Sequence, residues 1–193
     1  MSFGKLINME DKTILHSCLL VNHLWFEVVV RILWKNAWNF QYDMYYSYRI
    51  QHVSSPSAIL NTLIACLPND SKDLLYENRI SIPTPTLKPP LFNYISFIKV
   101  LLIDTINQNI KDFLQVNTLQ DLNNKKLLVL KELLKIFVSQ ISSLKTLKYS
   151  KEFQNIPFIN FPKSENCLTN LSNLICASTF LIDYLKSVIT YKI

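Results

Sequence analysis

The residues best suited to chemistry gather in one short stretch near the N-terminus, which holds His16, Cys18, His23 and Glu27. His23 and Glu27 are four positions apart, so a helix would place both on one face, where they could serve as two ligands of a metal ion. A metal site needs a third ligand, and the surrounding sequence offers none at a suitable spacing. We therefore expect no metal site and no thiol catalysis here, and interpret these side chains as polar positions on an otherwise buried helix.

Glycine is nearly absent, and this excludes whole classes of enzyme. The 193 residues contain one glycine, where average usage would supply roughly 13. The phosphate-binding loops GxGxxG and GxxxxGK[ST] and the nucleophile motif GxSxG each need at least two glycines, for positive φ or close backbone approach. No paired carboxylates stand in a catalytic context either. We expect the chain not to be an enzyme and to bind no cofactor.

Cysteine spacing and hydropathy indicate the cellular compartment in which the protein is expected. Cys18, Cys66, Cys167 and Cys176 form no CxxC pair, so we expect reduced thiols and no disulfide framework. The uncharged stretch most worth checking, 166–182, contains three asparagines and is shorter than the ~20 apolar residues of a membrane span. The first residues carry no signal-peptide pattern. These features predict a cytoplasmic or nuclear protein without a membrane partner.

Positive charge is concentrated toward the C-terminus. The net charge is +6, and residues 124–193 hold ten basic and four acidic side chains. Such an excess could mark a face for an acidic partner, but it also fits the solvated sides of helices. Nucleic-acid modules interleave basic and aromatic residues on one surface. Here the tyrosines of 42–48 are separated from the later lysines, so we do not expect nucleic-acid binding.

Hydrophobic periodicity predicts mostly helices. Residues 12–33 have helical spacing, with Asn22 as a cap between two short helices, whereas the aromatic stretch 34–50 has no clean period and fits an irregular cover. A further helix should follow Ser54, with Leu60, Leu63, Ile64 and Leu67 on one face, and a shorter one should follow Pro68.

The prolines of 82–90 predict an extended connector, and helical spacing resumes over 92–102 and 106–113. The clearest helix should be capped by Asn123 and Asn124. Its apolar stripe should contain Leu127, Leu130, Leu134, Phe137 and Ile141. The residues expected to face outward include Lys131, Glu132 and Lys135.

The last part of the chain repeats a short pattern. Leu144, Leu147 and Tyr149 have the spacing LxxLx followed by an apolar residue, and Leu171, Leu174 and Cys176 repeat it 27 positions later. A period of 20–29 residues that combines a strand with a helical return is typical of leucine-rich repeats. We therefore divide the chain into 1–35, a partial helical element; 36–81, an aromatic loop and helical segment; 82–90, the connector; and 91–193, a helical and repeat-like domain.

One segment carries a family resemblance. Cys18-Leu-Leu-Val21-Asn22-His23-Leu24-Trp25, followed by β-branched residues and the pair Leu33-Trp34, resembles the second half of an F-box. The downstream order is similar to that of fungal F-box and leucine-rich-repeat proteins: Trp34-Lys-Asn-Ala-Trp38, then Leu63-Ile-Ala-Cys66-Leu67-Pro68, then Lys88-Pro89-Pro90-Leu91-Phe92-Asn93-Tyr94. Two features depart from the family: the opening F-box helix is absent, and His23 stands where arginine is usual.

The resemblance implies a mainly α fold, with an incomplete N-terminal F-box-like helical element, a helical middle and a short C-terminal α/β leucine-rich-repeat segment. It implies a substrate receptor of a cullin-type (SCF) ubiquitin ligase, which binds a Skp-type adaptor and an unidentified protein target for ubiquitin-dependent degradation. The expected adaptor contacts are Leu19, Leu20, Leu24, Trp25 and Val28. The alternative is a truncated protein-interaction module without ligase coupling, since the missing helix would weaken adaptor binding and leave the repeats intact.

Overall fold

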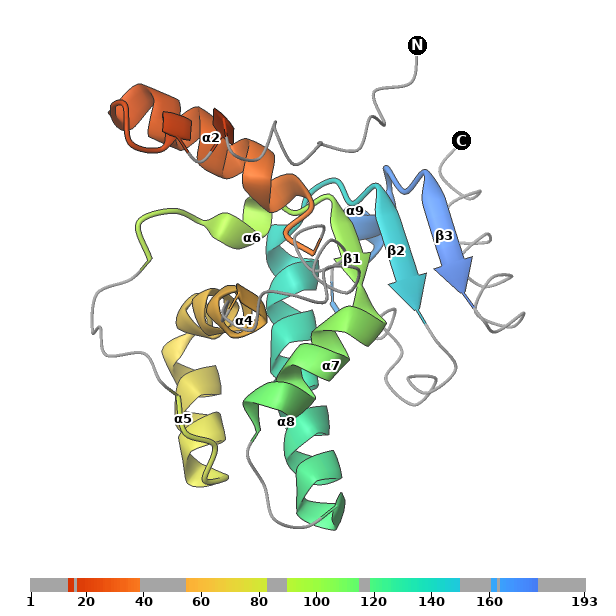
Figure 1. Ribbon diagram of the computed structural model, residues 1–193. Coiled ribbons are helices and arrows are strands. Elements are labelled where there is room, and N and C mark those ends of the chain that lie inside the picture. The colour runs from red at the N-terminus through yellow and green to blue at the C-terminus, as the bar shows by residue number, and fades with distance from the viewer. Residues whose placement is uncertain are drawn as a thin grey trace, which may run out of the picture.

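The computed structural model describes residues 14–15, 17–38, 55–82, 90–114, 119–149, 161–162 and 164–176. This part of the chain is mainly helical and contains one small parallel sheet (Figure 1), so the expectation of a mainly α protein is confirmed. The elements, in chain order, are α2 (His23–Lys35), α4 (Ser55–Ala65), α5 (Asn69–Glu77), α6 (Tyr94–Phe97), β1 (Val100–Leu102), α7 (Ile103–Phe113), α8 (Leu119–Gln140), β2 (Thr146–Tyr149), α9 (Ser164–Leu168) and β3 (Asn173–Cys176).

Helix α2 begins where the sequence predicts a cap. Asn22 has extended backbone angles, and its side-chain oxygen accepts a hydrogen bond from the backbone N–H of Trp25 at 3.0 Å. This bond satisfies one of the amide groups that the first turn of a helix leaves unpaired. The residues before Asn22 are helical at 14–15 and 17–18 and then turn. Two helical segments therefore meet at Asn22, as predicted.

Helices α4 and α5 also follow the prediction, and α5 ends in a full Schellman motif. Leu60, Leu63 and Ile64 of α4 are buried in the core as predicted, and Leu67 is buried just after the helix ends at Ala65. At the end of α5 the N–H groups of Arg79 and Ile80 bond to the carbonyls of Tyr76 and Leu75. Arg79 has a φ of 56°, a conformation that glycine adopts without cost and that arginine adopts at a penalty. The chain thus places an arginine where helices usually end on glycine.

The sheet has the order β1-β2-β3, and all pairs are parallel. Leu147 lies opposite Leu174 and Tyr149 opposite Cys176, so the 27-residue displacement in the sequence is also the register between β2 and β3. A third copy of the spacing precedes them: Ile98, Leu101 and Ile103 stand 46 residues before Leu144, Leu147 and Tyr149, and Leu101 lies opposite Leu147.

The prediction of continuous helical spacing over 92–102 is therefore wrong, because helix α6 ends at Phe97 and strand β1 follows it. Apolar residues three positions apart also fit a helical face, so the spacing alone favours a helix. Residues 100–102 adopt an extended conformation only because they pair with strand β2. The helix predicted over 106–113 is confirmed, and it begins at Ile103.

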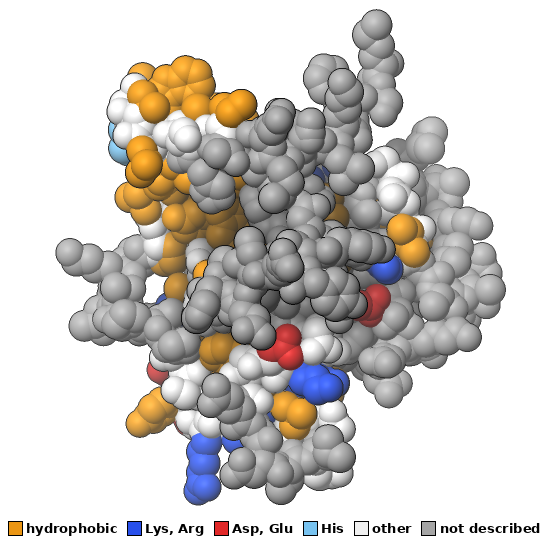
Figure 2. All heavy atoms as spheres, in the orientation of Figure 1, with side chains coloured by type: hydrophobic (Ala, Val, Ile, Leu, Met, Phe, Trp, Pro, Cys, Tyr) orange, Lys and Arg blue, Asp and Glu red, His pale blue; other side chains and the backbone are white. Residues whose placement is uncertain are grey.

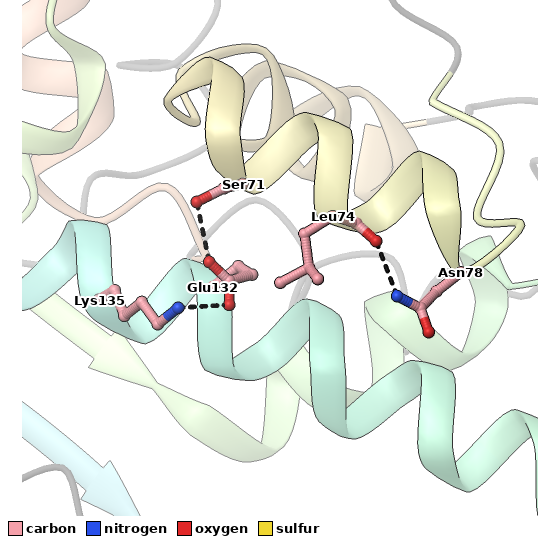
Figure 3. A network of polar contacts seen from close by, with 5 residues as sticks. All are labelled: Ser71, Leu74, Asn78, Glu132 and Lys135. Atoms are coloured by element: carbon pink, nitrogen blue, oxygen red, sulfur yellow. Dashed lines mark hydrogen bonds and ion pairs between the residues drawn. The ribbon is translucent and has the colours of Figure 1, made fainter.

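Helix α8 differs from the prediction in three respects. Leu127, expected on the apolar stripe, has an exposed fraction of 49%. The helix begins at Leu119, so Asn123 and Asn124 lie inside it and do not cap it. Leu122 packs against the core, and its burial outweighs the few tenths of a kcal/mol that asparagine costs within a helix. Glu132, expected to face outward, is 2% exposed. It accepts a hydrogen bond from Ser71 of α5 at 2.8 Å and pairs with Lys135 at 2.6 Å (Figure 3).

A single hydrophobic core connects the described parts on both sides of the predicted connector. It contains residues of α4 and α5 together with residues of α7, α8 and the sheet. Trp38 is its largest fully buried side chain. The aromatic residues 39–50 and most of the connector, 83–89, lie outside the described residues, and the four-part division of the chain stays a prediction.

Candidate partner-binding face on helix α2

Helix α2 is amphipathic, and aromatic contacts fix its inner face. Val29 and Val30 are buried. The ring centroid of Phe26 lies 5.5 Å from that of Phe92, and the centroid of Trp34 lies 4.7 Å from that of Tyr94. These tilted ring pairs join α2 to the segment that contains α6, and such pairs contribute about 0.5–1.5 kcal/mol each beyond area burial.

The opposite side of α2 exposes large apolar side chains. Leu24, Trp25 and Val28 have exposed fractions of 75%, 52% and 53%, and Leu20, just before the helix, is 89% exposed. Ile14 and Val21 are exposed as well. We call these six residues the α2 apolar face. Figure 2 shows hydrophobic side chains gathered over the α2 end of the molecule.

Four of the five predicted adaptor contacts, Leu20, Leu24, Trp25 and Val28, belong to this face, whereas Leu19 is half-buried. Ile14 and Val21 were not among the predicted contacts. No periodicity signal could have found Val21, because it lies in the turn before the cap Asn22 and outside α2. Whether these residues bind a partner stays a prediction.

The α2 apolar face has the chemistry of a protein-binding surface. Contiguous exposed apolar side chains mark interaction sites more often than isolated ones do. Tryptophan is among the residues that contribute most to binding when a partner encloses them. A helix that presents anchors at i, i+1 and i+4 suits an apolar groove of another protein. This surface can therefore bury apolar area against a partner, and it holds no group placed for bond chemistry.

The polar residues singled out from the sequence lie beside this face. Nδ1 of His23 and Oε1 of Glu27 are 3.6 Å apart, so the two side chains share a helix face as expected. Cys18 is half-buried, and His16 lies outside the described residues. Among the residues that the structure describes, no three His, Cys, Asp or Glu side chains come together as a metal site would require.

Two other cysteines have thiols whose pKa is raised by burial, and of these Cys167 is buried and Cys66 half-buried. Burial raises the pKa of the Cys66 thiol to about 11, although Lys72 and a backbone hydrogen bond from Tyr94 act in the opposite direction. Burial likewise raises the pKa of Cys167 to about 12 against the opposing charge of Lys99. Nucleophilic thiols need a lowered pKa and access to solvent, so we interpret Cys66 and Cys167 as packing residues and not as nucleophiles.

The C-terminal end of α2 is attached directly to the sheet. The carbonyl of Lys35 accepts a hydrogen bond from the N–H of Lys99 at 2.9 Å. Three residues later, the indole N–H of Trp38 donates to the carbonyl of Val100 at 3.1 Å. Both bonds lie at the outer edge of β1. The α2 apolar face is therefore held in a fixed position relative to the parallel sheet.

No described helix combines the length and hydrophobicity that crossing a bilayer requires. No protein-family model matches the chain, and no curated protein or solved structure is significantly similar to it.

Proposed function

We propose that the chain is a non-catalytic substrate-recognition adaptor of a cullin-type ubiquitin ligase, in which the α2 apolar face binds a Skp-type adaptor and the region of the parallel sheet binds a protein target. The observation that carries this proposal is the exposure of Leu20, Leu24, Trp25 and Val28 on one surface. These are residues that the F-box resemblance assigns to the adaptor contact.

The attachment of α2 to the sheet supports the same function. A substrate receptor must hold its target at a set position relative to the ligase, because transfer to the target depends on distance and orientation. The hydrogen bonds of Lys35 to Lys99 and of Trp38 to Val100 connect the adaptor-binding helix directly to the start of the first strand of the proposed target-binding region.

The three copies of the apolar spacing support a short leucine-rich-repeat-like array. Each copy places its central leucine, Leu101, Leu147 or Leu174, at the same register position of neighbouring parallel strands. Helices lie between the strands in the sequence, as in repeat units of this kind. The first interval, at 46 residues, is longer than a usual repeat because it holds the two helices α7 and α8. Such arrays bind proteins through residues that vary from unit to unit.

The test is a binding titration of the purified chain with a purified Skp-type adaptor. We expect a dissociation constant of about 10 µM or tighter, which corresponds to roughly −7 kcal/mol. A Leu24→Asp, Trp25→Ala double variant should bind at least about 30-fold more weakly, because it removes a central aromatic anchor and places a charge in an apolar contact.

A matched control makes the same chemical changes elsewhere. Leu127 on α8 and Tyr76 on α5 are also exposed, so Leu127→Asp with Tyr76→Ala tests whether any loss of exposed apolar area has the same effect. This control should bind like the unmodified chain. Absence of binding by the folded chain, or equal binding by both double variants, would contradict ligase coupling through α2. The first of these results would favour the interaction module without ligase coupling.

A further inference from the structure

Three lysines occupy consecutive positions at the amino-terminal end of the sheet. The Lys35 carbonyl accepts from the N–H of Lys99, and the Lys99 carbonyl accepts from the N–H of Lys145 at 2.8 Å. The Lys145 carbonyl in turn accepts from the N–H of Ser172 at 3.0 Å. Lys99, Lys145 and Ser172 thus stand at the start of three neighbouring strands, whose backbones are spaced by about 4.8 Å in a sheet, and Lys35, the last residue of α2, lies beside Lys99. We call Lys35, Lys99 and Lys145 the lysine row.

This arrangement places like charges where they repel each other. Like charges directly opposite on neighbouring strands are destabilising. The pKa of Lys99 is lowered by burial first, and then by the charges of Lys145 and Lys35. Ser172 occupies the next position of this row, so an uncharged residue is accommodated there. The sheet therefore does not require a lysine at each of these positions, and the repulsion between the lysines lowers the stability of the fold without being needed to form it.

Within the described ranges, no ion pair joins any lysine of the row to a carboxylate, whereas Glu27, Asp121 and Glu132 each pair with another residue. Lys99 Nζ instead donates to the hydroxyl oxygen of Ser143. That hydroxyl retains its own hydrogen for a further acceptor. Lys35 and Lys145 are exposed and Lys99 is half-buried, so a ligand can reach all three from solvent.

We propose that Lys35, Lys99 and Lys145, with the Ser143 hydroxyl, bind a doubly charged oxyanion of the phosphate class. Lysine ammonium groups bind phosphate oxygens as point charges, and charge-assisted hydrogen bonds are about twice as strong as neutral ones. A dianion between the ammonium groups would replace their mutual repulsion with attraction. The anion can be a phosphorylated side chain or free phosphate. The site is independent of adaptor binding by α2, which lies on other residues.

The test compares thermal unfolding in sodium phosphate and in sodium chloride at equal ionic strength. For the full chain, phosphate at ten times its dissociation constant should raise Tm by roughly 3–5 °C. The same series with capped phosphoserine, and with capped serine as its uncharged counterpart, distinguishes the two sources. A larger shift with capped phosphoserine than with phosphate identifies a phosphorylated side chain, and equal shifts identify phosphate itself. Both results support the site, provided that capped serine gives no shift.

The variants separate specific binding from the general effect of phosphate on protein stability. Lys99→Gln and Lys145→Gln should each remove at least half of the phosphate-dependent shift. Lys131→Gln, which removes an exposed lysine of α8 outside the row, should leave it unchanged. In chloride, Lys145→Gln should unfold at the same temperature as the unmodified chain or higher, because it relieves repulsion. An equal phosphate shift in all these proteins, or no shift in the unmodified chain, would overturn the proposal.

Discussion

The indole nitrogen of Trp38 and the carbonyl oxygen of Val100 are 62 residues apart in the sequence and 3.1 Å apart in the structure. This hydrogen bond joins the turn after α2 to the outer edge of β1. Trp38 is fully buried and Val100 is half-buried, so the bond lies at the edge of the core, where an unpaired carbonyl would be costly. One side chain thereby fills the core and completes the hydrogen bonding of the first strand.

Replacing Trp38 with phenylalanine should lower the free energy of unfolding by about 2–4 kcal/mol. The substitution removes the donor to Val100 and leaves a cavity where the larger ring stood. Urea unfolding measures the change. Trp25→Phe, at a half-exposed position on the α2 apolar face, should change stability by less than about 0.5 kcal/mol. Equal effects of the two substitutions would contradict the role of the hydrogen bond to Val100.

Asn22→Ala should destabilise α2 locally. Loss of a side-chain cap costs roughly 1 kcal/mol, and we expect faster hydrogen exchange at the amide of Trp25, which Asn22 protects. Asn22→Asp should retain the slow exchange, because aspartate also accepts this bond and favours the positive end of the helix. Exchange measured by NMR distinguishes the two variants, and similar rates in both would argue against capping.

Ser71 and Glu132 should be energetically coupled. Ser71→Ala removes a hydrogen bond to a buried carboxylate, so we expect a loss of about 1.5–3 kcal/mol. In a double-mutant cycle with Glu132→Met, the coupling energy should reach about 1 kcal/mol or more. Ser139→Ala is the control, since Ser139 donates only within its own helix, to the Ile136 carbonyl. Additive effects of Ser71→Ala and Glu132→Met would show that the contact in Figure 3 contributes nothing to stability.

Arg79→Gly should stabilise the protein slightly, by up to about 1 kcal/mol. Glycine adopts positive φ without the steric penalty that arginine bears, and its greater freedom in the unfolded chain offsets part of the gain. Arg79→Val should instead destabilise, since a β-branched residue tolerates this conformation poorly. Thermal unfolding of the two variants measures the difference, and the reverse order would rule out strain at the end of α5.

Cys66 and Cys167 should resist alkylation until the pH is strongly alkaline. With a pKa of about 11 in place of 9.0, Cys66 holds roughly 100-fold less thiolate at pH 8 than an ordinary cysteine. Because both pKa values are raised by folding, the stability these thiols contribute is complete below pH 9 and is lost as the pH rises toward 11–12. Iodoacetamide labelling followed by mass spectrometry tests this. Rates at pH 8 that match those of the urea-unfolded chain would contradict it.

Local signals predicted the parts of the fold that depend on local interactions. The cap at Asn22 and the buried face of α4 follow from side-chain chemistry and helical spacing. The pairing of β2 with β3 was visible as the 27-residue displacement, because strands that pair in register repeat their apolar positions. For the candidate site, the family resemblance pointed to five contacts, of which Leu20, Leu24, Trp25 and Val28 are exposed and Leu19 is half-buried; the contact itself stays a prediction.

What the sequence did not predict depends on partners distant in the chain. Strand β1 has three residues and is a strand only because β2 pairs with it. Glu132 has the sequence context of an exposed helix position, and it is buried because Ser71 and helix α5 cover it. The lysine row was missed for the same reason, since Lys35, Lys99 and Lys145 come together only through the order of the sheet.

The equivalence of Leu101, Leu147 and Leu174 sets rules for how the chain can change in length during evolution. One residue inserted within a strand would exchange Leu147 with Lys148 and reverse the inner and outer faces. The intervals of 46 and 27 residues between equivalent positions show that segments between strands can differ in length while the register is kept. We therefore expect insertions and deletions among homologous chains to fall between the strands, or to add and remove whole units.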